Sequence, residues 1–150
     1  MRDDNHGVIG IGYEGLSVAE LTSRIAGLGV TTLVDVRLNA ISRKRGFSKK
    51  ALSAYLTEHG VTYRHMPELG NPRENRAGYG DPGTQAGQDA RALFTARLES
   101  PEANDRLTEI VALASNERVA ILCFEKHETS CHRHEILNVV RTRLVDLVEA

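Results

Sequence analysis

Short apolar runs alternate with amphipathic segments along the chain. Four of the runs are rich in Val and Ile, the composition typical of buried strands. The predicted strands are Val8–Ile11, Thr31–Arg37, Val61–Met66 and Val119–Glu125. The last run, VAILCFE, is the most apolar, which favours a central strand that is covered on both faces.

Helical patterning fills most of the chain between these strands. Ser17 and Glu20 have the spacing of a capping box, so we expect a helix from Ser17 to about Leu28. Ser48 and Ser100 are the expected caps of two later helices. The helices predicted after the first are Lys49–His59, Asp89–Leu98, Pro101–Ala114 and Cys131–Val148.

One long segment, Pro67–Gln88, interrupts the alternation. It contains three of the four prolines and five of the thirteen glycines. Loops of this length inside a compact domain tend to be functional or mobile. The distal part, Arg73–Gln85, has no apparent apolar anchor, so few contacts offset the entropy of ordering it. We therefore predict a mobile lid that closes over the site near Cys131 when a ligand is bound.

The alternation of strands and helices predicts an α/β fold. We expect a Rossmann-like three-layer domain, with a mostly parallel sheet of about four strands and helices on both faces. The 150 residues, of which 41% are hydrophobic, are expected to form a single domain over 1–150. No apolar run approaches the ~20 residues of a membrane span, and the amino terminus lacks a signal-peptide pattern. We expect a cytoplasmic protein with no membrane partner.

The net charge of −1 excludes a global field that would attract nucleic acid. The charge is nevertheless uneven, because the segment 36–57 contains no acidic residue. Its six basic residues are Arg37, Arg43, Lys44, Arg45, Lys49 and Lys50. This stretch predicts a local positive patch that holds an anionic ligand, either a small molecule or nucleic acid.

Ligands of parallel α/β sheets bind beyond the carboxyl ends of the strands. Three segments are expected to meet there, namely Gly12–Gly15, Arg37–Phe47 and Lys126–Arg133. Asp35 and Arg37 are two positions apart on one strand and so point to the same side. Because a lone buried carboxylate is costly, Asp35 either pairs with Arg37, caps a loop, or takes a direct part in the site.

A glycine pattern at Gly10–Gly15 matches the G-x-G-x-x-G fingerprint of dinucleotide-binding proteins, with Asp35 at a suitable distance. Two features weaken this interpretation. The helix is expected to begin only at Ser17, and Glu14 would place a carboxylate near the pyrophosphate. A tight turn between strand and helix is the favoured alternative, and we predict no cofactor.

The strongest chemical signal is the segment around Cys131. We expect Cys131, His132 and Arg133 to open the last helix, where a thiolate is stabilised by the helix terminus and by neighbouring cations. Cations in a first helical turn call for an anion, either Glu125, Glu135 or a bound phosphate. In the alternative interpretation, Cys131 packs as a small apolar residue and Arg133 pairs with Glu125.

Metal binding is a third possibility for the same segment. His127 and Cys131 are four residues apart, with His132 and His134 nearby and Cys123 at the end of the preceding strand. Zinc sites favour short, regular pairs of ligands, and none is present here. We therefore predict no metal site.

Five motifs spread over most of the chain resemble the domain-of-unknown-function 488 family. They are Ile9–Tyr13, Leu33–Arg37, the residues 42–48, Tyr63–Gly70, and Leu122–Glu125 followed by Cys131–Arg133. The resemblance implies a Rossmann-like α/β domain and a shared site that includes Tyr13 and Gly70. It also favours the I-G-Y motif over the dinucleotide fingerprint, and it implies no settled reaction.

These patterns predict an enzyme that acts on a phosphate-bearing ligand, such as a nucleotide or the end of a nucleic acid. The expected nucleophile or redox thiol and the acid–base residues are Cys131, Glu125 and His132. The expected ligand-binding residues are Arg37, Arg43, Arg133, Asp35, Tyr13 and Gly70. The arginines are expected to converge on one anion. The alternative is a non-catalytic nucleic-acid-binding module that uses the stretch 37–50, with Phe47 and Tyr55 for base stacking.

Overall fold

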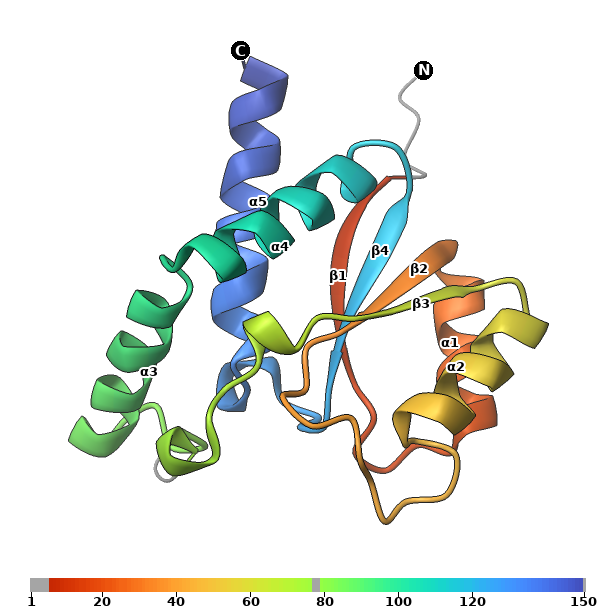
Figure 1. Cartoon of the computed structure of the whole chain (residues 1–150), viewed down its shortest axis with the longest axis horizontal. Helices are drawn as coiled ribbons and strands as arrows, with labels where there is room; N and C mark the ends of the chain where they lie inside the picture. Colours follow the sequence, from red (N-terminus) through yellow and green to blue (C-terminus); the bar gives the residue numbers. More distant parts are fainter. Residues whose placement is uncertain (1–5, 77–78, 150) are drawn as a thin grey trace.

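A parallel four-stranded sheet forms the centre of the structure (Figure 1). The computed structural model describes residues 6–76 and 79–149. The strands are β1 (Gly7–Gly12), β2 (Val30–Asp35), β3 (Thr62–His65) and β4 (Arg118–Cys123). Their order is β1-β4-β2-β3, and each neighbouring pair is parallel. All four strands overlap the predicted segments, with ends that differ by one or two residues, and β4 occupies the central position that its apolar sequence predicts.

Helices cover both faces of the sheet. They are α1 (Val18–Gly27), α2 (Lys49–Glu58), α3 (Gln85–Arg97), α4 (Pro101–Ala114) and α5 (Arg133–Glu149). Figure 1 shows α1 and α2 on one side of the sheet and α3, α4 and α5 on the other. This is the predicted Rossmann-like three-layer arrangement. Among the described residues, no helix has the length and apolar character needed to cross a membrane.

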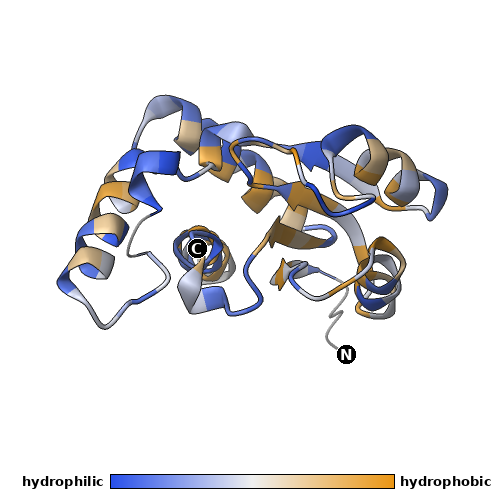
Figure 2. Ribbon diagram, turned by 90° about the horizontal axis from the view of Figure 1, so that it is seen from below, coloured by the Kyte–Doolittle hydropathy of each residue, from blue (hydrophilic) through white to orange (hydrophobic). Residues whose placement is uncertain are grey.

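The alternation of side chains along β4 divides the core into two clusters. Val119, Ile121 and Cys123 pack with residues of α3, α4 and α5, whereas Ala120 and Leu122 pack with residues of α1 and α2. Successive residues of a strand face opposite sides of its sheet, so a strand buried on both faces is apolar at every position. Figure 2 shows the hydrophobic strands enclosed between the two helical layers.

Capping explains most of the helix starts. Ser17 and Glu20 form the predicted capping box, and the Ser100 hydroxyl accepts from the amide of Ala103. Ser48 is the N-cap residue of α2, as predicted, but its hydroxyl makes no capping hydrogen bond and binds the backbone of Ser42 instead. Helix α3 begins at Gln85, four residues before the predicted start, since Thr84 caps it through the amide of Gly87.

The segment 67–88 contains more structure than the sequence indicates. Its first part forms two 3-10 turns, η1 (Pro67–Leu69) and η2 (Arg73–Asn75), and its last residues belong to α3. The expectation that it has no apolar anchor is wrong at Tyr79, which is buried edge-on against Phe94. Residues 80–86 are exposed throughout, and their mobility as a lid stays a prediction for hydrogen exchange. Residues 77–78 lie outside the described part of the chain.

Candidate functional site

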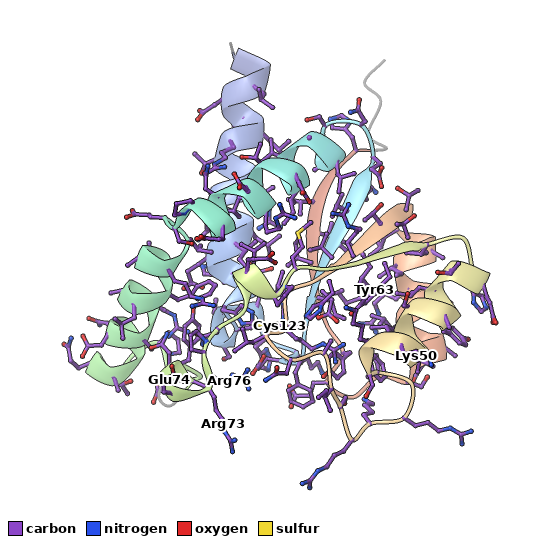
Figure 3. All side chains as sticks on the ribbon, in the orientation of Figure 1. Lys50, Tyr63, Arg73, Glu74, Arg76 and Cys123 are labelled. Carbon is purple, nitrogen blue, oxygen red and sulfur yellow. A yellow bond between two sulfur atoms is a disulfide. The ribbon has the colours of Figure 1, made fainter. Side chains whose placement is uncertain are left out.

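A pocket lies at the carboxyl ends of β1, β2 and β4, where the loops that follow these strands meet. Its volume is about 160 Å³. It is lined by Tyr13, Arg37, Asn39, Ile41, Asn71, Arg76, Tyr79, Cys123, Phe124, Glu125, Ser130, Cys131 and His132. Figure 3 shows Cys123 at the end of β4 and Arg76 in the loop that approaches it from the α3 side. The pocket therefore occupies the position where parallel α/β sheets bind their ligands.

One wall of the pocket contains a buried ion pair between Asp35 and Arg37. The Arg37 Nε and Nη2 atoms donate to the two carboxylate oxygens of Asp35, at 2.8 and 2.6 Å. The Asp35 carboxylate also accepts from the Arg37 amide at 3.1 Å. Although burial opposes the charged guanidinium, the Asp35 carboxylate raises the pKa of Arg37 above its usual range. Of the three alternatives that the sequence left open for Asp35, pairing with Arg37 is the one present, and Asp35 positions Arg37 at the pocket.

Two tyrosines complete this wall. The Tyr63 hydroxyl donates to Asp35 Oδ2 at 2.5 Å, and burial together with the charge on Asp35 raises the pKa of Tyr63. The Tyr13 hydroxyl accepts from Arg37 Nη1 at 3.2 Å. The ring of Tyr13 stacks on Phe47, with 4.4 Å between the ring centroids. Because Phe47 is fully buried, it cannot serve as the base-stacking residue that the nucleic-acid alternative requires.

The opposite wall contains the two cysteines, which are joined in a disulfide. Cys123 is the last residue of β4 and is 1% exposed, and Cys131 is 2% exposed. Helix α5 begins at Arg133, so the expected start at Cys131 is wrong. Cys131 instead has extended backbone at the end of the 3-10 turn η3 (Glu128–Ser130). In this oxidised form neither sulfur is a free thiol, so Cys131 becomes a nucleophile only after reduction.

His132 is held beside Cys131 in a defined tautomer. Its Nε2 lies 2.8 Å from the Val36 carbonyl oxygen, which only accepts, so Nε2 carries the hydrogen. Burial lowers the pKa of His132 to about 4, so the ring is neutral at neutral pH. The unprotonated Nδ1 lies 3.6 Å from Cys131 Sγ. The ring edge of His132 also contacts Phe94, which fixes its plane.

Arg133 contacts the cysteines from behind the pocket. Its Nη1 donates to Cys123 Sγ at 2.8 Å and to the Glu125 carbonyl oxygen at 2.6 Å, and Nη2 donates to the Lys126 carbonyl oxygen at 3.2 Å. Arg133 is 2% exposed, and its Nε has no hydrogen-bond partner in the described part of the chain. Burial lowers the pKa of Arg133, and the more distant carboxylates of Glu128 and Glu125 oppose this effect. The Arg133 side chain thus contacts the backbone carbonyl oxygen of Glu125 and forms no ion pair with the Glu125 carboxylate.

The glycines of the apparent dinucleotide fingerprint serve close packing. A Cβ atom at Gly12 would lie 1.8 Å from the Glu125 carbonyl oxygen, and one at Gly10 would lie 2.6 Å from Leu137 Cδ1. Both positions also face the Arg133 side chain. Any side chain on β1 here would displace the connection from β4 to α5, so these glycines allow Arg133 to reach the cysteines.

The structure brings together only some of the ligand-binding residues that the sequence predicts. Tyr13 and Arg37 line the pocket, and Asp35 lies behind Arg37. Gly70 packs against the loop after β2, where a Cβ atom would lie 2.5 Å from Leu38 Cα.

The expected convergence of the arginines fails for Arg43, which is exposed and does not line the pocket. Arg133 lines a second, larger hollow of about 570 Å³, together with His127 and residues of β1. Of the three predicted arginines, only Arg37 therefore faces the cysteine pocket.

The sequence reasoning missed the contribution of the segment between β3 and α3. Arg76 lines the pocket and donates through Nε to the Asn71 carbonyl oxygen at 3.2 Å. No carboxylate in the described ranges pairs with Arg76. Tyr79 closes the same side, with the Arg91 guanidinium 4.3 Å from its ring centroid. The sequence contained one signal for this role, namely arginines in a loop that was expected to approach the site.

Three donor atoms at the base of the pocket have metal-ligand chemistry. The sulfurs of Cys123 and Cys131 and a ring nitrogen of His132 lie within 4.8 Å of one another. Thiolates bind metals, and sulfurs joined in a disulfide do not, so only the reduced protein would offer this set. The other histidines considered from the sequence lie elsewhere. His127 lines the second hollow, and His134 contacts the Glu128 carboxylate at 3.1 Å.

Comparison with known proteins relates most of this structure to one family. The profile of the family described as "Domain of unknown function DUF488" matches residues 17–140, which include β2 to β4, both cysteines and Arg133. No curated protein and no solved structure matches the chain. The matched residues cover well over half of the sequence. The chain belongs to the DUF488 family.

Proposed function

We propose that the protein is a cysteine-dependent enzyme that acts on a small phosphate-bearing ligand, such as a nucleotide or the end of a nucleic acid. One observation carries the proposal. The unprotonated Nδ1 of His132 faces Cys131 Sγ at 3.6 Å, while Nε2 is fixed by the Val36 carbonyl oxygen. A nucleophile beside a base that a third group orients is the arrangement used in nucleophilic catalysis.

In the reduced protein, Cys131 is the nucleophile and His132 accepts its proton as the sulfur attacks the substrate. Because burial lowers the pKa of His132 to about 4, Nδ1 is unprotonated throughout the neutral range, and the ring acts as a weak base whose contribution is its position beside the sulfur. Glu125 lines the same pocket, with Oε2 3.7 Å from Cys123 Sγ. We assign Glu125 to proton transfer at the leaving group.

The polar lining of the pocket suits an anion. Arg76 presents a guanidinium that pairs with no carboxylate in the described part of the chain, and Arg37 is a second arginine in the lining. The charge of Arg37 is balanced by Asp35, so Arg76 provides the main attraction for a phosphate. The rim is apolar, with Ile41 81% exposed and Phe124 46% exposed. An exposed aromatic ring and an aliphatic side chain favour a ligand whose phosphate enters the pocket while a flat base remains at the rim.

Binding of nucleoside monophosphates to the reduced protein tests this proposal. We expect saturable binding in calorimetry that weakens at least about fivefold in Arg76→Gln, the loss of one exposed charge contact. Arg73→Gln is the matched control, because Figure 3 shows Arg73 extending away from the molecule and it does not line the pocket. Equal binding by both variants would overturn the assignment of Arg76.

The role of Cys131 needs a separate measurement. With substrate analogues that carry a good leaving group, we expect the wild type to release that group and Cys131→Ser to bind without releasing it. The competing nucleic-acid-binding module predicts a different result. It predicts affinity that falls steeply with salt, survives Cys131→Ser, and weakens when Arg43 and Lys50 on the exposed basic stretch are replaced.

A further inference from the structure

Arg133 is a buried cation that forms no ion pair with a carboxylate of the described residues, and only the more distant carboxylates of Glu128 and Glu125 offset its charge. Its guanidinium is held by two backbone carbonyl oxygens and reaches Cys123 Sγ at 2.8 Å. The Glu128 carboxylate, a nearby candidate partner, contacts His134 instead at 3.1 Å. Burying a charge without a counter-ion is costly. Among the described residues, the atom in direct contact with Arg133 that can become an anion is Cys123 Sγ. The Glu125 carboxylate, 3.7 Å from this sulfur, opposes a negative charge there, and the closer Arg133 guanidinium at 2.8 Å counteracts it.

We propose that Cys123 and Cys131 form a redox-active disulfide that exchanges with a small anionic thiol in the pocket, and that Arg133 holds the Cys123 thiolate released by the exchange. This goes beyond the proposed function, because it assigns Cys123 and Arg133, which that function does not use. It also explains how the Cys131 thiol becomes available for catalysis.

The exchange follows from the environments of the two sulfurs. The thiolate of the incoming thiol attacks Cys131 Sγ, the bond between the two cysteine sulfurs breaks, and its electron pair leaves on Cys123 Sγ beside Arg133. A second thiolate then attacks the sulfur of the bound thiol, which releases a disulfide of the small thiol and the Cys131 sulfur. Two electrons pass from two thiols to one disulfide. A stabilised leaving thiolate accelerates the first step, so Cys123 is the leaving sulfur and Cys131 the attacked one.

The pocket selects the class of thiol. Both sulfurs are almost completely buried, and the pocket of about 160 Å³ admits a small molecule more readily than the surface of another protein. Arg76 stands in the lining without a carboxylate partner in the described ranges. A thiol that carries a carboxylate or sulfonate therefore gains a favourable contact that an uncharged thiol lacks.

The oxidised wild-type protein tests the selection directly. Its reduction by 2-mercaptoethanesulfonate and by uncharged 2-mercaptoethanol is followed at neutral pH by mass spectrometry of the free thiols, with rates compared at equal thiolate concentration. We expect the anionic thiol to react about fivefold faster or more, and Arg76→Gln to remove the preference while Arg73→Gln keeps it. Equal rates with both thiols in the wild type would overturn the assignment of the anionic class.

The role of Arg133 in the exchange is tested with one variant that removes its positive charge and one that keeps it. We expect Arg133→Met to slow reduction by both thiols about tenfold, and Arg133→Lys to restore part of the rate. A rate in Arg133→Met equal to that of the wild type would overturn the role of Arg133. Because Arg133 is buried and these variants can fail to fold, a second experiment uses the cysteines alone.

In this second experiment, reduced proteins are exposed to the oxidised form of the anionic thiol. The wild type is expected to form its internal disulfide, whereas Cys123→Ser accumulates a mixed disulfide on Cys131, visible as added mass. A wild type that keeps both thiols free would overturn the proposal. So would bound zinc in the reduced protein, which would make the sulfurs metal ligands. Nucleoside monophosphate binding by Cys123→Ser is measured in parallel, so loss of the redox reaction is distinguishable from failure of the proposed function.

Discussion

Two buried arginines lie on opposite sides of the pocket in different electrostatic settings, Arg37 in its lining and Arg133 behind the cysteines. On the β2 wall, Arg37 forms a two-point ion pair with Asp35 and a further hydrogen bond with Tyr13. On the other side, behind the wall that contains the cysteines, Arg133 contacts carbonyl oxygens and Cys123 Sγ, and no carboxylate of the described residues pairs with it.

This difference separates a structural role from a chemical one. A buried charge that is balanced and fully hydrogen-bonded holds its neighbours in place and has little left to offer a ligand. A buried charge that lacks a permanent partner stabilises whichever anion forms beside it. The β2 wall therefore provides a rigid support, and the wall around Cys123 provides the changing charge that chemistry requires.

The largest expected effect comes from removing the balanced anion. Asp35→Ala leaves Arg37 buried without its counter-ion, so we expect the free energy of unfolding to fall by about 3–5 kcal/mol, measured by urea denaturation. The double variant with Arg37→Met should recover part of this loss, because both charges are then removed. A loss below about 1 kcal/mol would contradict the supporting role of this pair.

The neutral His132 makes stability depend on pH. Its pKa is lowered from 6.5 to about 4 in the folded protein, so the unfolded chain binds a proton in this range that the folded chain does not. The stabilisation is complete above the unfolded pKa and is lost as the pH falls toward about 4, by up to ~3 kcal/mol. When the free energy of unfolding is measured by urea denaturation at several pH values in this range, it should change less with pH in His132→Asn than in the wild type. The control is the replacement of the exposed His59 by Gln, which should leave the pH dependence of the free energy of unfolding as it is in the wild type.

Removing the unbalanced cation should cost less than removing the balanced anion. Arg133→Met loses hydrogen bonds to carbonyl oxygens and leaves no carboxylate unpaired, so we expect a loss of about 1–3 kcal/mol in the oxidised protein. The loss should increase when a reductant is present, because the Cys123 thiolate then lacks its cation. Urea denaturation with and without dithiothreitol measures both values. The comparison between the two walls fails if Arg133→Met is as damaging as Asp35→Ala in the oxidised protein.

The smallest effect is expected from Tyr63. Tyr63→Phe removes one hydrogen bond to the Asp35 carboxylate, and Arg37 continues to neutralise that carboxylate, so the expected loss is about 1 kcal/mol. Tyr55→Phe is the matched control, since the contacts of Tyr55 are made by its ring and backbone. The midpoints of thermal unfolding of the wild type, Tyr63→Phe and Tyr55→Phe measure this loss. An unchanged midpoint in Tyr63→Phe would show that the Tyr63 hydrogen bond to Asp35 is dispensable.

Much of this architecture follows from local patterns in the chain. The continuous apolar run of β4 predicts its central place, because a strand between two helical layers buries both faces. The spacing of Ser17 and Glu20 predicts the start of α1, because both contacts of a capping box lie within one helical turn. The pairing of Asp35 with Arg37 is also local, since residues two apart on a strand share a side. The parallel alternation then brings Tyr13, Arg37 and Cys131 to one edge of the sheet.

Other features depend on packing between distant segments. The contact of Arg133 with Cys123 requires the close approach that Gly10 and Gly12 allow on β1, and these glycines alone resemble a dinucleotide fingerprint. The roles of Arg76 and Tyr79 depend on how the segment after β3 lies against α3 and the loop after β4.

The sequence by itself thus determined the layers, the strand that lies at the centre and the edge at which the site forms, because these follow from periodicity and short-range hydrogen bonds. Only the tertiary structure decided which charges are balanced and which side chains meet at the cysteines. Whether a buried arginine has a carboxylate within reach depends on the three-dimensional positions of residues that are remote in the chain, and periodicity carries no information about that distance.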